Sequence, residues 1–239
     1  VVVSDHGQFP IFETVRVNRA LADTGLVKTA EVNGRTRVAA DSSMVAITGG
    51  AAVHLYLNLE GREPDGVVAK AEAAEYLRAA ARALADLEAE GRPAVEKILT
   101  REEAASVGLD HPNSGDLVVV LAPGFAASAT LDGPALEPSR YYGQHGFLAA
   151  HDEMCGMLFA RGVGIKRTRM GEVSSTAVAP MVARWLGIEL GGRSREREPL
   201  KNSGSPQFIV FSCLIENGRH RCRPWGLALL SRGEGRPDS

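Results

Sequence analysis

The feature that most constrains the fold is an almost wholly apolar run at residues 116–122, with the sequence Asp-Leu-Val-Val-Val-Leu-Ala. Pro123 and Gly124 end this run. A strand carries apolar side chains at successive positions when both of its faces are buried, and a parallel sheet covered by helices provides such burial. The run therefore predicts a buried strand in a mainly parallel sheet, followed by a long loop up to Gly146.

Three further segments have strand character. Residues 53–59 alternate between an apolar face and a polar face that begins with His54, which is the period of two expected of a half-buried strand. Residues 1–4 begin with three valines, and residues 157–160 are again mostly apolar. We expect all three segments to be strands.

Two segments have the helical period. Apolar side chains recur every three or four positions between residues 69 and 90, and Gly91 with Pro93 supplies a stop. Residues 176–186 repeat the pattern, with Val178, Met181 and Trp185 on one side. Strands that alternate with helices predict α/β layers, in which the first helix covers a sheet.

The composition excludes several classes of protein. The 239 residues carry a formal net charge of −2, which leaves no nucleic-acid footprint. No apolar run approaches the roughly 18 residues of a membrane helix, and the three cysteines lack the CxxC spacing of a zinc knuckle. Residues 193–239 hold nine Lys+Arg and five Asp+Glu without clear periodicity, apart from strand character at residues 207–215. We therefore expect a domain at residues 1–192 and an irregular basic tail at residues 193–239.

The sharpest chemical motif directly follows the first strand. Residues 1–7 read Val-Val-Val-Ser-Asp-His-Gly, so a carboxylate (Asp5) and an imidazole (His6) lie side by side at a strand end. Ligands bind at such ends in open α/β sheets, and these two groups suit Zn²⁺ or a similar ion. Gly7 would let the chain turn away without crowding the metal. A turn in which Asp5 caps the following residues is the alternative interpretation.

A second histidine closes the long loop. His145 lies in the sequence Gly-Gln-His-Gly at residues 143–146, where the glycines permit a close approach of the backbone to a ligand. The pattern fits either a metal ligand or a surface histidine whose neighbours need a positive φ. Gly49 and Gly50, by contrast, form only a flexible pair that lacks the spacing of a phosphate-binding loop.

Several motifs occur in a familiar order. They are Ser4-Asp5-His6-Gly7, Asn-Leu-Glu-Gly-Arg-Glu-Pro-Asp-Gly-Val-Val at residues 58–68, Gly-Asp-Leu-Val-Val at residues 115–119, Gly-Gln-His-Gly at residues 143–146 and Ala-Pro-Met-Val-Ala-Arg-Trp-Leu-Gly at residues 179–187. In this order they resemble the type I phosphodiesterase/nucleotide pyrophosphatase family of the alkaline phosphatase superfamily. The resemblance covers roughly residues 1–192.

The resemblance implies a fold and a chemistry. The family's fold is a doubly wound α/β sheet with helices on both faces, and its members use two metal ions, usually zinc, to move a phosphoryl group onto a Thr or Ser and then to water. By resemblance, Asp5 and His6 would bind one metal and His145 the other. The implied partner is a small phosphorylated substrate, a nucleotide or a phosphodiester.

The family's nucleophile lies upstream of its Asp-His motif. We therefore expect the alkaline-phosphatase-like fold to be incomplete at the N-terminus of this chain, with the nucleophile before Val1. Thr14, Thr24 and Thr48 do not follow a recognisable strand-to-helix turn, so none is assigned as the nucleophile. Two alternatives stay open: a related phosphomonoester, phosphonoacetate or sulfate hydrolase, and a truncated fragment without catalytic activity.

The remaining polar residues favour structural roles. His54, on the polar face of its strand, fits a hydrogen-bonded structural histidine, and Arg62 with Glu63 fits an ion pair. His151 fits either the solvated start of a helix or a partner that orients a metal-bound imidazole.

Overall fold

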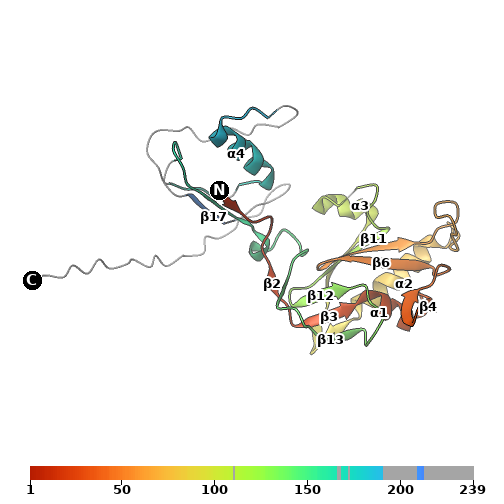
Figure 1. Cartoon of the computed structure of the whole chain (residues 1–239). Coiled ribbons are helices and arrows are strands. Elements are labelled where there is room, and N and C mark those ends of the chain that lie inside the picture. Colours follow the sequence, from red (N-terminus) through yellow and green to blue (C-terminus); the bar gives the residue numbers. More distant parts are fainter. Residues whose placement is uncertain (110, 166–167, 172, 191–208, 213–239) are drawn as a thin grey trace, which may run out of the picture.

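The computed structural model describes residues 1–109, 111–165, 168–171, 173–190 and 209–212. Two lobes are apparent (Figure 1). We call residues 11–138 the central lobe, and the described parts of residues 1–4, 157–190 and 209–212 the terminal lobe. Within the described residues, the chain crosses between the lobes through residues 5–10 and residues 139–156 (Figure 1).

The strands of the central lobe are β3 (Glu13–Arg16), β4 (Thr29–Val32), β5 (Arg35–Val38), β6 (Met44–Gly49), β7 (Ala52–Leu57), β8 (Glu88–Ala89), β9 (Arg92–Pro93), β10 (Val95–Thr100), β11 (Leu117–Leu121), β12 (Phe125–Ser128) and β13 (Leu136–Pro138). Its helices are α1 (Val17–Asp23), α2 (Ala73–Ala85), α3 (Arg101–Ala104) and the 3-10 turn η1 (Ala105–Val107).

The terminal lobe contains β1 (Val2–Val3), β15 (Met157–Ala160), β16 (Thr168–Arg169), η3 (Ser175–Ala177), α4 (Val178–Leu186) and β17 (Ile209–Ser212). The two crossings contain β2 (Phe9–Pro10), β14 (Gly143–Gln144) and η2 (Asp152–Met154).

The main sheet of the central lobe has the order β10-β11-β7-β6, and every neighbouring pair is antiparallel. The prediction of a buried strand at residues 116–122 is confirmed, because all five residues of β11 are buried. Its expected parallel pairing is wrong. Leu117, Val119 and Leu121 face the main core, whereas Val118 packs with Leu99 and with Ala104 of α3. Helix α3 thus covers the second face of an antiparallel strand.

The predicted strand at residues 53–59 corresponds to β7, in which Val53, Leu55 and Leu57 are buried. The predicted helix at residues 69–90 is shorter, since α2 ends at Ala85 and the chain turns into the β8–β9 hairpin. Helix α2 buries Ala80 and Leu84 in the same core as β7. This helix therefore packs against the main sheet, as expected.

The long loop expected at residues 123–146 instead contains short strands. Strand β12 pairs in parallel with β3, and β13 pairs with the other edge of β3 in the antiparallel direction. Residues before the main sheet also form elements that the sequence patterns miss, namely β2 to β5 and α1. Short strands of this kind carry too few residues for a clear period of two.

The terminal lobe has the sheet order β1-β15-β17-β16. Helix α4 and strand β15 confirm the segments predicted at residues 176–186 and 157–160, and they share a small core around Leu158, Ala160 and Ile165. Strand β17 lies within the segment predicted at residues 207–215. The rest of the predicted tail, residues 193–208 and 213–239, lies outside the described residues.

Taken together, the described residues form a mixed α/β fold of small sheets, and within them the doubly wound parallel sheet is not formed. Parallel pairing is restricted there to β3–β12, β16–β17 and a bridge between Leu59 and Val68. Across the described ranges, no helix is both long and apolar enough to cross a membrane.

Candidate metal centre

The two histidine motifs lie on the two crossings between the lobes (Figure 1). Strand β1 is fixed to β15 at its end, where the Ser4 N–H donates to the Met157 carbonyl and the Ser4 hydroxyl accepts from the Met157 N–H. Asp5 and His6 follow at once. Strands β2 and β14 then pair in antiparallel register, with Phe9 opposite Gln144. This pairing brings the residue after β14, His145, next to the Asp-His motif.

The structure brings the two predicted histidines together. The imidazole rings of His6 and His145 are stacked, with centroids 4.6 Å apart and an interplanar angle of 28°. His6 is two-thirds buried, whereas the Asp5 side chain is 85% exposed. The three predicted side chains therefore meet at one place on the surface of the crossing.

Asp5 and His6 have the spacing of two ligands of one metal. The Oδ2 atom of Asp5 lies 3.4 Å from Nε2 of His6. Two ligands of a tetrahedral zinc ion, each bound at about 2.0–2.2 Å, are separated by about 3.3–3.5 Å. The donor atoms already have this separation, so this pair fits a divalent zinc-like ion.

The tautomer of His6 suits the same role. Its Nδ1 atom lies 2.8 Å from the Gly7 carbonyl oxygen, which can only accept a hydrogen bond. In the neutral ring, Nδ1 therefore carries the proton and Nε2 presents its lone pair on the side of Asp5. A backbone carbonyl that orients a ligating imidazole in this way is common around protein-bound metals.

The alternative interpretation of Asp5 as a turn residue is compatible with this arrangement. Its Oδ1 atom accepts from the His6 N–H at 3.0 Å, which is a local hydrogen bond within the turn. The other carboxylate oxygen, Oδ2, is the one that faces the His6 ring. The Oδ1 atom of Asp5 is thus used in the turn, whereas Oδ2 has the position of a candidate donor to a metal ion.

The described residues do not form a complete metal site. Among these residues, no group of three or more His, Cys, Asp or Glu side chains is arranged to hold a metal ion. Asp5 and His6 bring two candidate donor atoms close together, and the His145 ring lies beside them at the adjacent strand end. A tetrahedral site for each of two metals needs more ligands than these three.

A second group of motif residues is structural. Arg62 donates from Nη1 to Oδ1 of Asp116 at 2.6 Å and from Nη2 to Oδ2 at 2.8 Å, and it also reaches the Leu57 carbonyl and Glu63. The predicted ion pair with Glu63 is confirmed, while the stronger partner, Asp116, was missed. Arg62 and Asp116 both lie in motifs that carry the family resemblance, and this shared membership is the sequence signal that could have predicted their contact.

This ion pair changes the acidity of Asp116. Burial alone raises the pKa of its carboxyl group, but hydrogen bonds from Arg62 and from the Leu57 N–H favour the charged form and bring the pKa below its usual value. The same pairing raises the pKa of Arg62. The pair links the end of β7 to the start of β11 and keeps these two neighbouring strands of the main sheet together.

The other histidines of the sequence analysis have structural partners. The Nδ1 atom of His54 accepts from the Gly115 N–H at 3.1 Å, and burial lowers the pKa of this imidazole. His151, at the start of η2, contacts both carboxylate oxygens of Glu96 at 2.9–3.0 Å. His54 is therefore the structural histidine that was expected, and His151 joins the second crossing to the central lobe.

The candidate hydroxyls do not form a nucleophilic site. Thr14 is buried in β3, and the Thr24 hydroxyl donates to the Leu21 carbonyl at the end of α1. Thr48 lies within β6. No residue of this group is therefore assigned a catalytic role.

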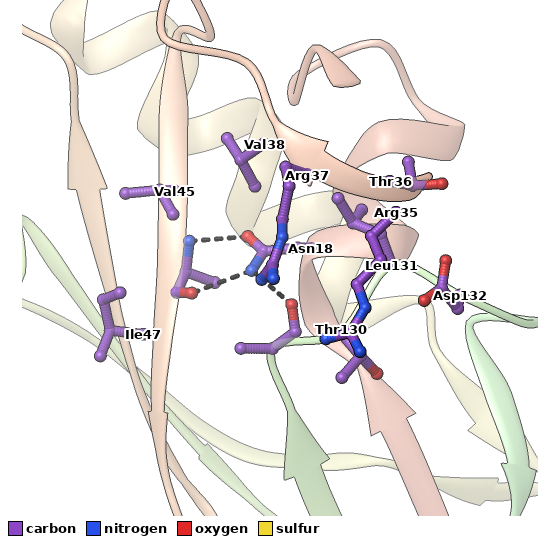
Figure 2. A pocket seen from close by; sticks show the side chains of 12 residues that line it. Asn18, Arg35, Thr36, Arg37, Val38, Val45, Ile47, Thr130, Leu131 and Asp132 are labelled. Carbon is purple, nitrogen blue, oxygen red and sulfur yellow. Dashed lines mark hydrogen bonds between the residues drawn. The ribbon is translucent and has the colours of Figure 1, made fainter. Parts of the chain in front are cut away.

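A cavity of about 330 Å³ lies elsewhere in the central lobe, between β5, β6 and the loop after β12 (Figure 2). Its buried floor is Asn18, which donates to the carbonyls of Ala46 and Ala129 and accepts from the Ala46 N–H. These bonds, drawn as dashed lines in Figure 2, commit the Asn18 amide to joining α1 to the sheet. The lining contains none of Asp5, His6 and His145.

Fold and site together define a mixed α/β protein with a carboxylate–imidazole pair at a strand end, two groups of the kind that bind divalent metal ions. The sequence profile of the type I phosphodiesterase / nucleotide pyrophosphatase family matches residues 1–148, more than half of the chain. The chain belongs to this family. The matched region includes Asp5, His6 and His145, and the family supports a phosphoester hydrolase that acts on small phosphoesters. No curated protein and no solved structure matches the chain.

Proposed function

We propose that this chain is part of a metal-dependent phosphoric ester hydrolase that cleaves phosphodiester or nucleotide pyrophosphate bonds with two divalent metal ions, zinc in the first instance. The observation that supports it most strongly is the meeting of Asp5, His6 and His145, with the two imidazoles stacked at 4.6 Å. Membership of the family supports the class of reaction.

In this proposal each residue has a defined task. Asp5 Oδ2 and His6 Nε2 hold one metal ion, and His145 holds the second. When bound, two such ions activate the nucleophile and neutralise charge on the attacking and leaving oxygens of an in-line displacement. The Gly7 carbonyl keeps the His6 proton on Nδ1, so that Nε2 remains a ligand.

The nucleophile, a Thr or Ser, comes in this proposal from residues before Val1, as do the remaining metal ligands and the strands of a doubly wound sheet. The state of β1 supports this idea. It is an edge strand in the described sheet, and Val1, Val2 and Val3 are 56%, 64% and 48% exposed. The open edge of such an apolar strand has backbone N–H and C=O groups that can pair with a further strand.

The alternative without catalysis is supported by one observation: although Asp5, His6 and His145 lie close together, no three such side chains among the described residues are arranged to hold one metal ion. If the native product has the length of this chain, we expect weak zinc binding and negligible hydrolysis of phosphodiesters. Hydrolysis of phosphomonoesters, phosphonoacetate or sulfate esters would use the same metal centre with different substrate contacts.

The test is the hydrolysis of bis(4-nitrophenyl) phosphate by the native gene product, whose intact mass also reveals any residues before Val1. We expect a larger product with zinc-dependent activity. His145→Ala should lose zinc and activity together, whereas His111→Ala, a change in an exposed turn, should retain both. Full zinc and full activity in His145→Ala would refute the assignment.

A further inference from the structure

The tight turn between β6 and β7 lies against His145. Gly49 and Ala52 form the last pair of the hairpin, so Gly50 and Ala51 are its two turn residues. Gly50 has a φ of +72°, and a glycine at the first turn position is typical of hairpins with a type II′ turn. The turn is therefore built around a residue without a side chain.

The contact between this turn and the His145 loop is made by backbone atoms. The Ala51 N–H donates to the His145 carbonyl oxygen at 2.8 Å, and the Gly50 carbonyl accepts from the Ala127 N–H at 3.1 Å. Strand β12, which contains Ala127, is thus hydrogen-bonded to the turn, and the turn is hydrogen-bonded to the backbone of His145. In this way a backbone hydrogen bond connects the central lobe to His145.

Glycine is required on both sides of this contact. A Cβ atom on Gly50 would lie 2.3 Å from the His145 carbonyl oxygen and 3.2 Å from its Nδ1 atom. A Cβ atom on Gly146 would lie 2.5 Å from the Gly49 carbonyl oxygen. Cβ atoms stay at least about 3 Å from such atoms, so alanine at Gly50 would move the two backbones apart by more than half an ångström.

We infer that Gly50 is a positioning residue for His145: the β6–β7 turn of the central lobe fixes the backbone, and with it the imidazole, of the second metal ligand. This inference rests on the proposed function for the role of His145. A ligand must be held to within about 0.5 Å of its productive position to bind metal well. A shift of the expected size at His145 would therefore weaken the metal site and disturb the stack with His6.

The experiment compares Gly50→Ala with Gly34→Ala in the full chain. Gly34 is the matched control, because it lies in the β4–β5 hairpin turn with a φ of +71° and an added Cβ would meet nothing within 4 Å. Both variants place a Cβ atom on a turn residue with a positive φ, and only Gly50→Ala adds the clash with His145. Gly50→Asn and Gly34→Asn form a second pair, in which a different side chain is placed in the same two turns.

Two readouts are measured on each variant. The first is the chemical shifts of the His6 and His145 imidazoles by NMR without metal, which report the ring stack directly. The second is the affinity for zinc ion alone by titration calorimetry. We expect Gly50→Ala and Gly50→Asn to shift both imidazole signals and to weaken zinc binding at least tenfold, whereas the Gly34 variants stay within twofold of the unmodified chain.

Unchanged imidazole shifts in folded Gly50 variants, or equal shifts in the Gly34 variants, would overturn the inference. A failure of the proposed function gives a different result from a failure of this inference. If the proposed function is wrong, His145→Ala binds zinc as the unmodified chain does, while the imidazole shifts measured without metal still show whether Gly50 positions His145.

Discussion

The imidazole of His6 stacks on that of His145, with ring centroids 4.6 Å apart. The first residue follows strand β1 of the terminal lobe, and the second follows strand β14 of the returning crossing. The stack therefore depends on the antiparallel register of β2 and β14. A change that disturbs either crossing should be detectable at this pair of rings.

Gly7 offers the most direct disturbance of the first crossing. Its N–H donates to the Met154 carbonyl at 2.9 Å, and a Cβ atom there would lie 1.8 Å from the Glu153 carbonyl oxygen. We expect Gly7→Ala to cost about 3 kcal/mol or more in the free energy of unfolding, because the backbone of η2 has to move. Gly171→Ala, where an added Cβ meets nothing within 4 Å, is the control. Denaturant unfolding measures both, and equal stability of the two variants would contradict the contact.

Arg62 is predicted to stabilise the central lobe through Asp116. We expect Arg62→Ala to lose about 2 kcal/mol, because it leaves a mostly buried carboxylate without its main partner, although the exposure of Arg62 itself limits the loss. Arg19→Ala is the control, since its pair with Asp23 is about half exposed on both sides and should be worth less than about 0.5 kcal/mol. Urea unfolding of the two variants decides the comparison.

The same pair makes a prediction about acid stability. Because the folded-state pKa of Asp116 is lowered, its contribution is complete above its unfolded-state pKa and is lost as the pH falls through the folded-state pKa. Arg62→Ala should bring the folded-state pKa of Asp116 upward, towards its unfolded-state value, so the stability of the variant should fall less on acidification than that of the unmodified chain. An unchanged acid-unfolding profile in Arg62→Ala would contradict the assigned cause.

His54 makes an independent contribution to the pH dependence. Burial lowers its folded-state pKa from 6.5, so the unfolded chain binds its proton first, and stability falls as the pH drops below about 6.5 towards the folded-state pKa. His54→Asn should remove this slope, since the asparagine oxygen can accept the Gly115 N–H without titrating. Thermal unfolding between pH 5 and 8 measures the effect. A slope that persists in His54→Asn would show that another group causes it.

The elements that the sequence predicts well are those whose pattern reflects burial along a single segment. The alternation of Val53, Leu55 and Leu57 depends only on which face of β7 meets the core, and the structure confirms it. Residues 157–160 and 176–186 are predicted for the same reason. For these segments the local pattern is sufficient.

The direction of strand pairing could not be obtained in this way. Both faces of β11 are buried because α3 covers Val118 on one side while the main core covers Val119 on the other. A short helix that packs over an antiparallel strand produces the same apolar run as a parallel sheet. Only the identity of the neighbouring strands, β10 and β7, distinguishes the two cases.

The candidate site was also only partly readable from the sequence. Asp5 and His6 are neighbours in the chain, and the family resemblance suggested His145 as their companion. The support from the β6–β7 turn is not apparent in the sequence, where Gly49 and Gly50 have only the pattern of a flexible pair. Their role depends on a contact with a loop far along the chain, which no local spacing reveals.

The measurement that tests the central claim most directly is the zinc affinity of the 239-residue chain, determined by titration calorimetry for the unmodified protein and for His6→Ala, His145→Ala and His111→Ala. The account predicts measurable but weak zinc binding that His6→Ala and His145→Ala each reduce at least tenfold and that His111→Ala leaves unchanged. Zinc binding that is the same in all four proteins would contradict the assignment of His6 and His145 as metal ligands.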